Sequence, residues 1–151
     1  MALMLRIIET VLAIPRWFGR LITSQKRSKD CIYLTVEEVI EFNVKVTNIQ
    51  GQLRDRAGLE SALMRPQMAS HYEQADIVTQ AALLVDGICM AHAFNDGNKR
   101  TALIACTTFL DVNGYMLEDA EIQVGKEIEA LVVTRDLEHF TEWLRKHIQI
   151  L

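Results

Sequence analysis

Two long apolar segments lie next to each other in the chain, at residues 75–93 and 98–115. Their apolar residues recur on almost every side of a helix rather than along one stripe, and such a helix is buried over most of its surface. A chain of 151 residues can build one domain around a single core. The two segments are therefore predicted to be the central helices of that core.

Helical periodicity also precedes this pair. Thr35 and Glu38 have the spacing of a capping box, in which each side chain satisfies a free backbone N–H at the start of a helix. The helix that follows is predicted over residues 36–49. A second, short helix over 59–66 is predicted to stop at Pro66, because a proline ring disfavours helical conformation in the residue before it.

The part of the chain after the apolar pair continues the pattern. Asn113 and Gly114 tolerate a left-handed backbone and are expected to end the second apolar helix. Amphipathic helices are predicted at 119–133 and 136–149, and no run of alternating residues indicates a strand ladder. The expected architecture is all-α, a compact bundle of six to eight helices.

Residues 1–29 stand apart from the expected domain, residues 30–151. Residues 1–22 are apolar but interrupted by charges and Pro15, so they are unsuited to spanning a bilayer, and they lack a secretory cleavage site. Their spacing favours a basic amphipathic helix. We favour a helix packed on the domain over one that contacts a membrane surface or a partner, and a translation start placed too far upstream is a further alternative.

The composition indicates the class of partner and the cellular compartment of the chain. Sixteen basic against 20 acidic residues give a net charge of −4, which argues against nucleic acid as the main partner. The three cysteines lack the C-x-x-C spacing of a zinc or redox site, and their odd number is typical of the reducing cytoplasm. Cys89 and Cys106 lie in the apolar segments, where a thiol fills space in the core.

Residues 92–100, HAFNDGNKR, concentrate polar chemistry between the two apolar helices. Gly97 and Asn98 come just before the second helix, whose first N–H groups and dipole favour an anion. Lys99 and Arg100 oppose that dipole and would be poor choices for helix stability alone. Their presence predicts a negatively charged ligand.

Two further side chains of this turn suit phosphate chemistry. Asp96 is a candidate ligand for Mg²⁺, which proteins hold through one or two carboxylates together with substrate phosphates. His92 is the candidate general base for an attacking hydroxyl. Taken singly, each has a structural alternative: a helix cap for Asp96 and an interior histidine for His92. Together with the cations they indicate phosphoryl or nucleotidyl transfer.

The stretch HAFNDGNKRTAL resembles the signature of the Fic/Doc family, H-x-F-x-[DE]-[GA]-N-[GK]-R, and RDRAGLESALMRPQ and YLTVEEVIEFN resemble its Doc (death-on-curing) branch. The resemblance covers about residues 31 to 148 and implies a Fic-type helical fold. It also implies ATP and Mg²⁺ as cofactors. The roles it implies are His92 as catalytic base, Phe94 as core anchor, Asp96 as Mg²⁺ ligand, Gly97 and Asn98 as the anion-binding turn, and Lys99 and Arg100 as cations that contact phosphate.

The resemblance also distinguishes two reactions. Many adenylyl-transferring Fic proteins have glycine in place of Lys99 and a second arginine in place of Leu103. The present pair resembles Doc, which implies a toxin that phosphorylates elongation factor Tu with ATP and is neutralised by an antitoxin supplied in trans. The alternatives are transfer of a nucleotide monophosphate from the same site and a catalytically silent binding module.

Three other histidines attract attention. His71, with Tyr72, is expected in a linker ahead of the first apolar helix, solvated rather than contacting a protein target. His139 and His147 lie eight residues apart among charged neighbours and are expected on a solvated helix face. Glu129 is likewise expected on a helix surface.

Overall fold

The computed structural model of the chain describes residues 30–118 and 121–151. The predicted N-terminal extension, residues 1–29, lies outside the described residues, and so does the helix expected over 1–22.

The described residues form six helices and two short strands, which confirms the expected all-α bundle. In chain order the elements are α3 (Val36–Thr47), α4 (Arg56–Glu73), α5 (Ile77–Ala91), α6 (Asn98–Val112), β1 (Tyr115–Leu117), α7 (Glu121–Thr134), α8 (Leu137–His147) and β2 (Ile148–Ile150).

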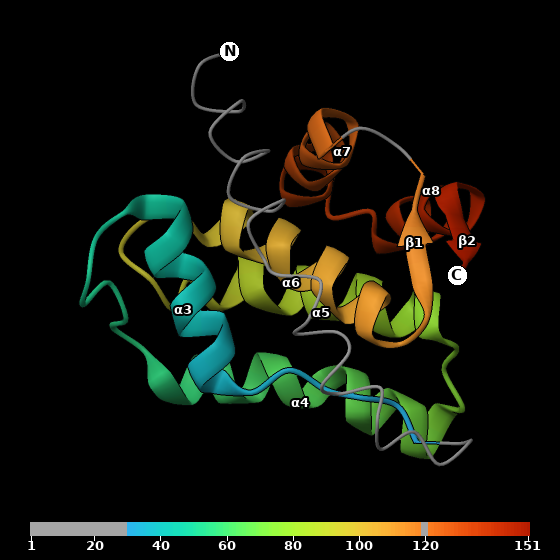
Figure 1. Ribbon diagram of the computed structural model, residues 1–151, viewed down its shortest axis with the longest axis horizontal. Helices are drawn as coiled ribbons and strands as arrows, with labels where there is room; N and C mark the ends of the chain where they lie inside the picture. Colours follow the sequence, from blue (N-terminus) through green and yellow to red (C-terminus); the bar gives the residue numbers. More distant parts are fainter. Residues whose placement is uncertain (1–29, 119–120) are drawn as a thin grey trace.

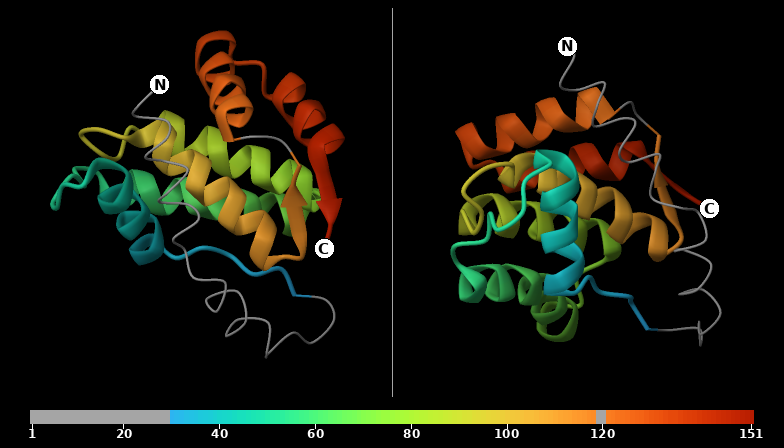
Figure 2. Two further views of the ribbon diagram at one scale, coloured as in Figure 1. Left: turned by 45° about the horizontal axis from the view of Figure 1, so that its top comes forward. Right: turned by 60° about the vertical axis from the view of Figure 1, so that its left-hand side comes forward.

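The two apolar helices, α5 and α6, lie side by side in the middle of the bundle (Figures 1 and 2). α4 and α8 pack against α5, α3 packs against α6, and α7 contacts both. Most residues of α5 and α6 are buried, as predicted from their apolar periodicity. The turn between them is therefore held by the most deeply buried part of the molecule.

Local signals place most helix ends correctly. The Glu38 N–H donates to Thr35 Oγ1 over 3.2 Å and the Thr35 N–H donates to Glu38 Oε2 over 2.7 Å, which is the predicted capping box. Gly114 adopts the expected left-handed conformation (φ +88°) after α6. Asn113 does not adopt it: its side-chain Nδ2 donates to the carbonyls of Phe109 and Ile32 instead, so it ties α6 to the segment before α3.

The prediction that Pro66 ends a short helix was wrong. Pro66 lies in the interior of α4, on its buried side, and the helix continues to Glu73. The ring removes the N–H that would bond the Ala62 carbonyl. At that point α5 comes close, because a Cβ added to Gly87 would lie 3.1 Å from the Ala62 oxygen. Burial of the apolar side of α4 against α5 offsets the lost hydrogen bond.

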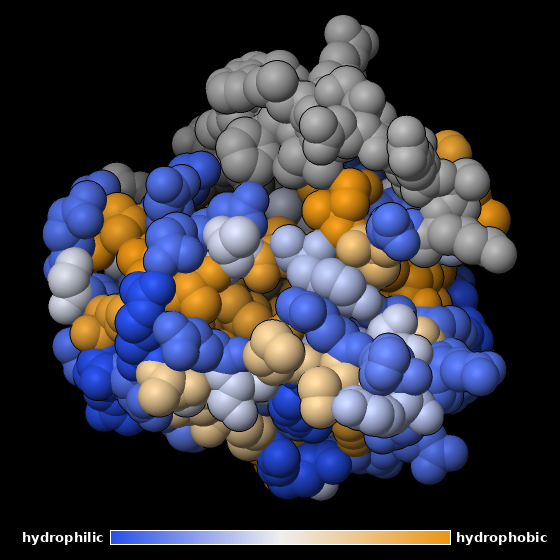
Figure 3. Space-filling view, turned by 90° about the horizontal axis from the view of Figure 1, so that it is seen from below, coloured by the Kyte–Doolittle hydropathy of each residue, from blue (hydrophilic) through white to orange (hydrophobic). Residues whose placement is uncertain are grey.

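Because α4 is longer than predicted, His71 and Tyr72 lie in its last turn, so the expected linker was wrong and their expected exposure to solvent is confirmed. Both are exposed, and their rings meet edge to face with centroids 4.7 Å apart. Met64 and Met68 lie on the same outer face of α4, each 48% exposed. Figure 3 shows the side of the molecule that includes this face, where apolar residues are interspersed among hydrophilic ones.

A small antiparallel pair of strands accompanies the six helices of the described residues. β1 and β2 pair with Tyr115 opposite Ile150 and Leu117 opposite Ile148. The sequence shows no signal for these strands, because three residues are too few to show alternation. The pair joins the end of α6 to the end of α8.

The cysteines are free, and Cys89 and Cys106 are buried in the core as predicted. Burial raises the pKa of each of these two thiols to about 12, so neither is a nucleophile near neutral pH. None of the described helices combines the length and the apolar character that crossing a membrane requires.

Candidate active site at the turn between α5 and α6

A pocket of about 420 Å³ opens at the turn between α5 and α6. All six residues predicted for the site line it. α7 supplies a facing wall, and the lining residues are Cys89, His92, Asn95, Asp96, Gly97, Asn98, Lys99, Arg100, Glu129 and Val132.

The turn is shaped by two side chains of the motif. Phe94 is 1% exposed, as expected of a core anchor. The Asn98 side chain binds the Phe94 backbone twice: Oδ1 accepts from the Phe94 N–H over 3.1 Å, and Nδ2 donates to the Phe94 carbonyl over 2.9 Å. Asn98 thus closes the turn, and its amide is committed to this task.

A segment from the loop after α3 also supports the turn. Leu53 and Phe94 form an isolated antiparallel bridge, and the Arg54 N–H donates to the Ala93 carbonyl over 2.8 Å. On the other side of Phe94, the Asn95 N–H donates to the Gln52 carbonyl over 2.9 Å. Backbone hydrogen bonds therefore fix both sides of Phe94.

The N-terminus of α6 faces the pocket with free backbone donors. Gly97 precedes the helix in a left-handed conformation (φ +80°) and makes no side-chain cap. The first intrahelical bond runs from the Thr101 N–H to the Gly97 carbonyl over 2.8 Å. The N–H groups of residues 98–100 therefore point out of the helix end, where the helix dipole favours an anion.

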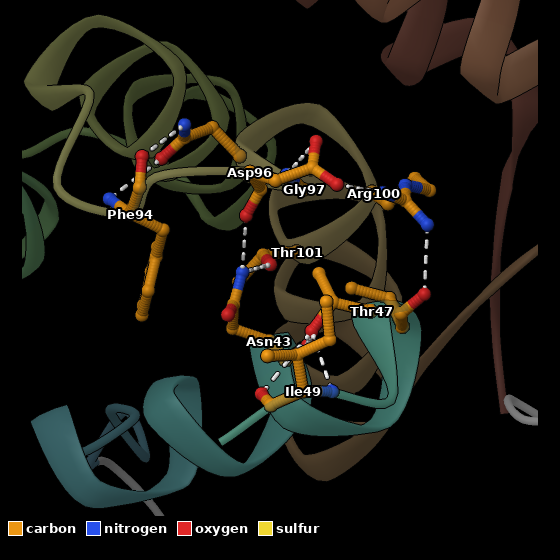
Figure 4. A network of polar contacts seen from close by, with 10 residues as sticks. Asn43, Thr47, Ile49, Phe94, Asp96, Gly97, Arg100 and Thr101 are labelled. Carbon is orange, nitrogen blue, oxygen red and sulfur yellow. Dashed lines mark hydrogen bonds and ion pairs between the residues drawn. The ribbon is translucent and has the colours of Figure 1, made fainter. Parts of the chain in front are cut away.

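Asp96 and Arg100 form an ion pair beside these donors (Figure 4). Asp96 Oδ1 accepts from the Gly97 N–H over 2.7 Å, and Oδ2 lies 3.1 Å from an Arg100 guanidinium nitrogen. A second guanidinium nitrogen of Arg100 donates to the Val46 carbonyl of α3 over 2.7 Å. Arg100 is thereby held in one orientation, with 24% of its side chain exposed.

His92 and Lys99 are exposed groups of the site whose charged or titratable ends make no hydrogen bond or ion pair within the described part of the chain. His92 ends α5 with a left-handed backbone (φ +44°), and its carbonyl accepts from Arg54 Nε over 2.9 Å. Among the described residues, no hydrogen bond occupies the His92 ring and no ion pair occupies the Lys99 ammonium group. Both side chains are available to a ligand in the pocket.

The residues present fit a magnesium ion bound together with phosphate. The Asp96 side chain is 66% exposed, and its two oxygens retain lone pairs beyond the contacts to Gly97 and Arg100. Within the described part of the chain, no three histidine, cysteine or acidic residues gather into a ligand set of their own. A cation here would therefore need oxygens from its ligand, which is how Mg²⁺ is usually held beside phosphates.

Several residues that contact the turn or line the pocket were not predicted from the sequence. Asn43 of α3 contacts the turn, and its one signal was a polar residue inside the apolar stripe of that helix. Glu129 was expected on a helix surface; it is exposed and also lines the pocket, together with Val132. These two residues lie three apart on one side of α7. That spacing does not indicate a pocket unless it is known that this side of α7 faces the turn between α5 and α6.

The comparison with known protein families agrees with this geometry. The family model described as the Fic/DOC family matches residues 33–110, which include α3, the turn and most of α6. That range is more than half of the chain. The chain belongs to the Fic/DOC family, as the resemblance of residues 92–100 predicted.

A relative in this family is Toxin Doc of Mycolicibacterium smegmatis (strain ATCC 700084 / mc(2)155). The two sequences are 34% identical over 107 residues, which cover 69% of this chain and 82% of the relative. The resemblance to the Doc branch is thereby confirmed.

Proposed function

We propose that the chain is a Doc-like toxin that transfers the γ-phosphate of ATP to a hydroxyl group of a protein target. The observation that carries the proposal is the start of α6, where three open N–H groups, Lys99 and Arg100 meet at a pocket that His92 also lines. Membership of the Fic/DOC family and the similarity to a Toxin Doc support the same class of enzyme.

The residues divide the work of the reaction. The start of α6, with Lys99 and Arg100, would bind the triphosphate, and Asp96 would hold Mg²⁺ against it. Bound Mg²⁺ would neutralise charge on the transferring group. His92 would take the proton of the target hydroxyl while its oxygen bonds to the γ-phosphorus. The bond from that phosphorus to the bridging oxygen breaks, and ADP leaves.

The choice of γ-phosphate over nucleotide transfer is supported by two residues. Lys99 adds an exposed cation where many adenylyl-transferring relatives have glycine. Leu103, at the place of their second arginine, is 5% exposed and packs in the core. The pocket thus lacks that second guanidinium group and gains a compact charge, which suits a transferring phosphoryl group.

Labelled ATP tests the reaction class. The purified chain is incubated with elongation factor Tu, the proposed target, and with ATP labelled at either the α- or the γ-phosphate. We expect label to enter the protein from the γ position only. Transfer from the α position would show the nucleotidyl reaction instead.

His92→Ala separates an enzyme from a silent binding module. Loss of the base is expected to lower the transfer rate by about 10²- to 10⁴-fold, and toxicity in the host should disappear with it. A variant that still arrests growth would show that toxicity comes from binding. Circular dichroism of the variant checks that the fold is retained.

The proposed biology includes translation arrest in the cytoplasm and an antitoxin that acts in trans. Co-expression with the product of the adjacent upstream reading frame tests the second part. Growth should recover, and the two proteins should purify together. Growth arrest that continues despite expression of that product would remove the antitoxin assignment.

A further inference from the structure

Helix α3 contacts the turn of the site at both ends of the first turn of α6 (Figure 4). Asn43 Nδ2 donates to the Asp96 carbonyl over 2.8 Å and to Thr101 Oγ1 over 3.1 Å. Four residues further along α3, Thr47 lies against the turn, since a Cβ added to Gly97 would come within 2.7 Å of its methyl group. The backbone N–H groups of residues 98–100 therefore lie between Asp96 and Thr101, the two residues to which Asn43 donates hydrogen bonds.

The burial of Asn43 is unfavourable by itself. The side chain is 1% exposed, and its Oδ1 has no hydrogen-bond partner among the described residues. A buried acceptor without a partner costs stability, and an apolar residue of similar size would avoid that cost. The two donor contacts of Nδ2 are what an apolar residue could not supply.

We propose that Asn43 is a positioning residue for the nucleotide site, setting the Asp96 carboxylate and the open N–H groups of α6 in one arrangement. This inference rests on the proposed function, because it assumes that the site binds a magnesium nucleotide. Asn43 lies outside the motif at residues 92–100, is 1% exposed and is not among the residues that line the pocket. It acts through the backbone of Asp96 and the hydroxyl of Thr101.

The control for this proposal is Asn113, which makes a similar contact at the other end of α6. Its side chain binds the backbone of Ile32 through both Oδ1 and Nδ2 and also the Phe109 carbonyl. Like Asn43, it ties α6 to a segment that precedes it in the chain. Unlike Asn43, Asn113 lies at the C-terminal end of α6, whereas the pocket-lining residues of α6 lie at its N-terminal end.

The experiment measures binding of the β,γ-imido analogue of ATP to the full chain by calorimetry, with and without Mg²⁺. Asn43→Leu is expected to weaken the affinity in Mg²⁺ by about ten-fold or more, as loss of an outer-shell partner does at metal sites. The gain in affinity that Mg²⁺ gives should shrink as well. Asn113→Leu should lower stability in urea and leave both quantities within about two-fold.

The outcomes separate this inference from the proposed function. If the unmodified chain does not bind the analogue, the proposed function fails and the inference with it. If the chain binds and Asn43→Leu binds equally well with the same response to Mg²⁺, the inference alone is overturned. Equal loss in both asparagine variants would show a structural role only and would also overturn it.

A second variant covers the case in which Asn43→Leu does not fold. Thr101→Val keeps the shape of the side chain in α6 and removes the hydroxyl that accepts from Asn43. Loss of the hydrogen bond between Asn43 and Thr101 should weaken binding of the ATP analogue about three-fold. Unchanged affinity and an unchanged response to Mg²⁺ would count against the proposal.

Discussion

The N-terminus of α6 differs from those of α3, α4, α5 and α8. Each of these four helices is preceded by a residue whose side-chain oxygen accepts a hydrogen bond from a backbone N–H of the first turn. These N-cap residues are Thr35, Asp55, Asp76 and Asp136 respectively. α6 begins with Gly97, has no such cap, and carries Lys99 and Arg100 in its first turn. Capped ends stabilise their helices, whereas the end of α6 leaves its donors open at some cost in stability, as the proposed anion site requires.

Gly97→Ala is expected to have the largest effect on this comparison. The added methyl group meets Thr47 at 2.7 Å, and alanine disfavours a φ of +80°. The free energy of unfolding should fall by about 3 kcal/mol, and nucleotide binding should be lost. Urea unfolding measures the first and calorimetry the second.

Gly51→Ala is the matched control for that substitution. Gly51 has a similar φ of +71°, but a Cβ there would meet nothing within 4 Å. Only the backbone strain should remain, about 1 kcal/mol. If the two variants lose equal stability, the close approach of Gly97 to α3 does not contribute to the cost of the Gly97→Ala substitution.

Lys99→Glu should move binding and stability in opposite directions. Affinity for the ATP analogue is expected to fall at least about ten-fold, because a cation is replaced by an anion next to phosphate. The free energy of unfolding should rise by about 0.5 kcal/mol, because a carboxylate suits a helix N-terminus. Lys146→Glu, in the last turn of α8, should lower stability instead and leave binding unchanged. If Lys99→Glu binds normally, Lys99 has no part in the site.

Removal of a cap should affect stability alone. Thr35→Ala breaks the capping box of α3 and is expected to cost about 1 kcal/mol in urea unfolding. Because Thr35 is eight residues from Asn43 and outside the pocket, the affinity for the ATP analogue should not change. A change in affinity would show that the capped end of α3 is coupled to the site.

The smallest effect concerns the cap of α5. Asp76 pairs with Arg145 over 2.5 Å, and this hydrogen bond lowers the pKa of Asp76 from its ordinary 3.8 to about 2. A carboxyl group whose pKa is lower in the folded than in the unfolded chain stabilises the fold at pH values above the unfolded pKa. That stability is lost as the pH falls from about 4 to about 2. The Asp76 side chain is 50% exposed, so solvent screening limits the pair to about 0.5 kcal/mol.

Asp76→Asn tests that pair, because asparagine still caps the helix. The difference in unfolding free energy between the chain and the variant should be present at pH 7 and vanish near pH 2. A difference that does not depend on pH would assign the effect to the cap and not to the ion pair.

Much of the fold was predictable because its signals are local. The capping box of Thr35 and Glu38 and the apolar periodicity of α5 and α6 depend only on neighbours in the chain. The candidate site was predictable for the same reason, since residues 92–100 lie in one turn and the six predicted site residues among them line one pocket together. Pro66 shows the limit: a local rule predicted a helix end, and packing of α4 on α5 overrode it.

The sequence alone determined that two buried helices would meet at a polar turn and that this turn would carry a histidine, an aspartate and two cations. Only the tertiary structure decided what surrounds them. It placed Asn43 under the start of α6, Glu129 and Val132 across the pocket, and the Val46 carbonyl against Arg100. Such contacts join residues that lie tens of positions apart, so no periodicity or spacing in the sequence encodes them directly.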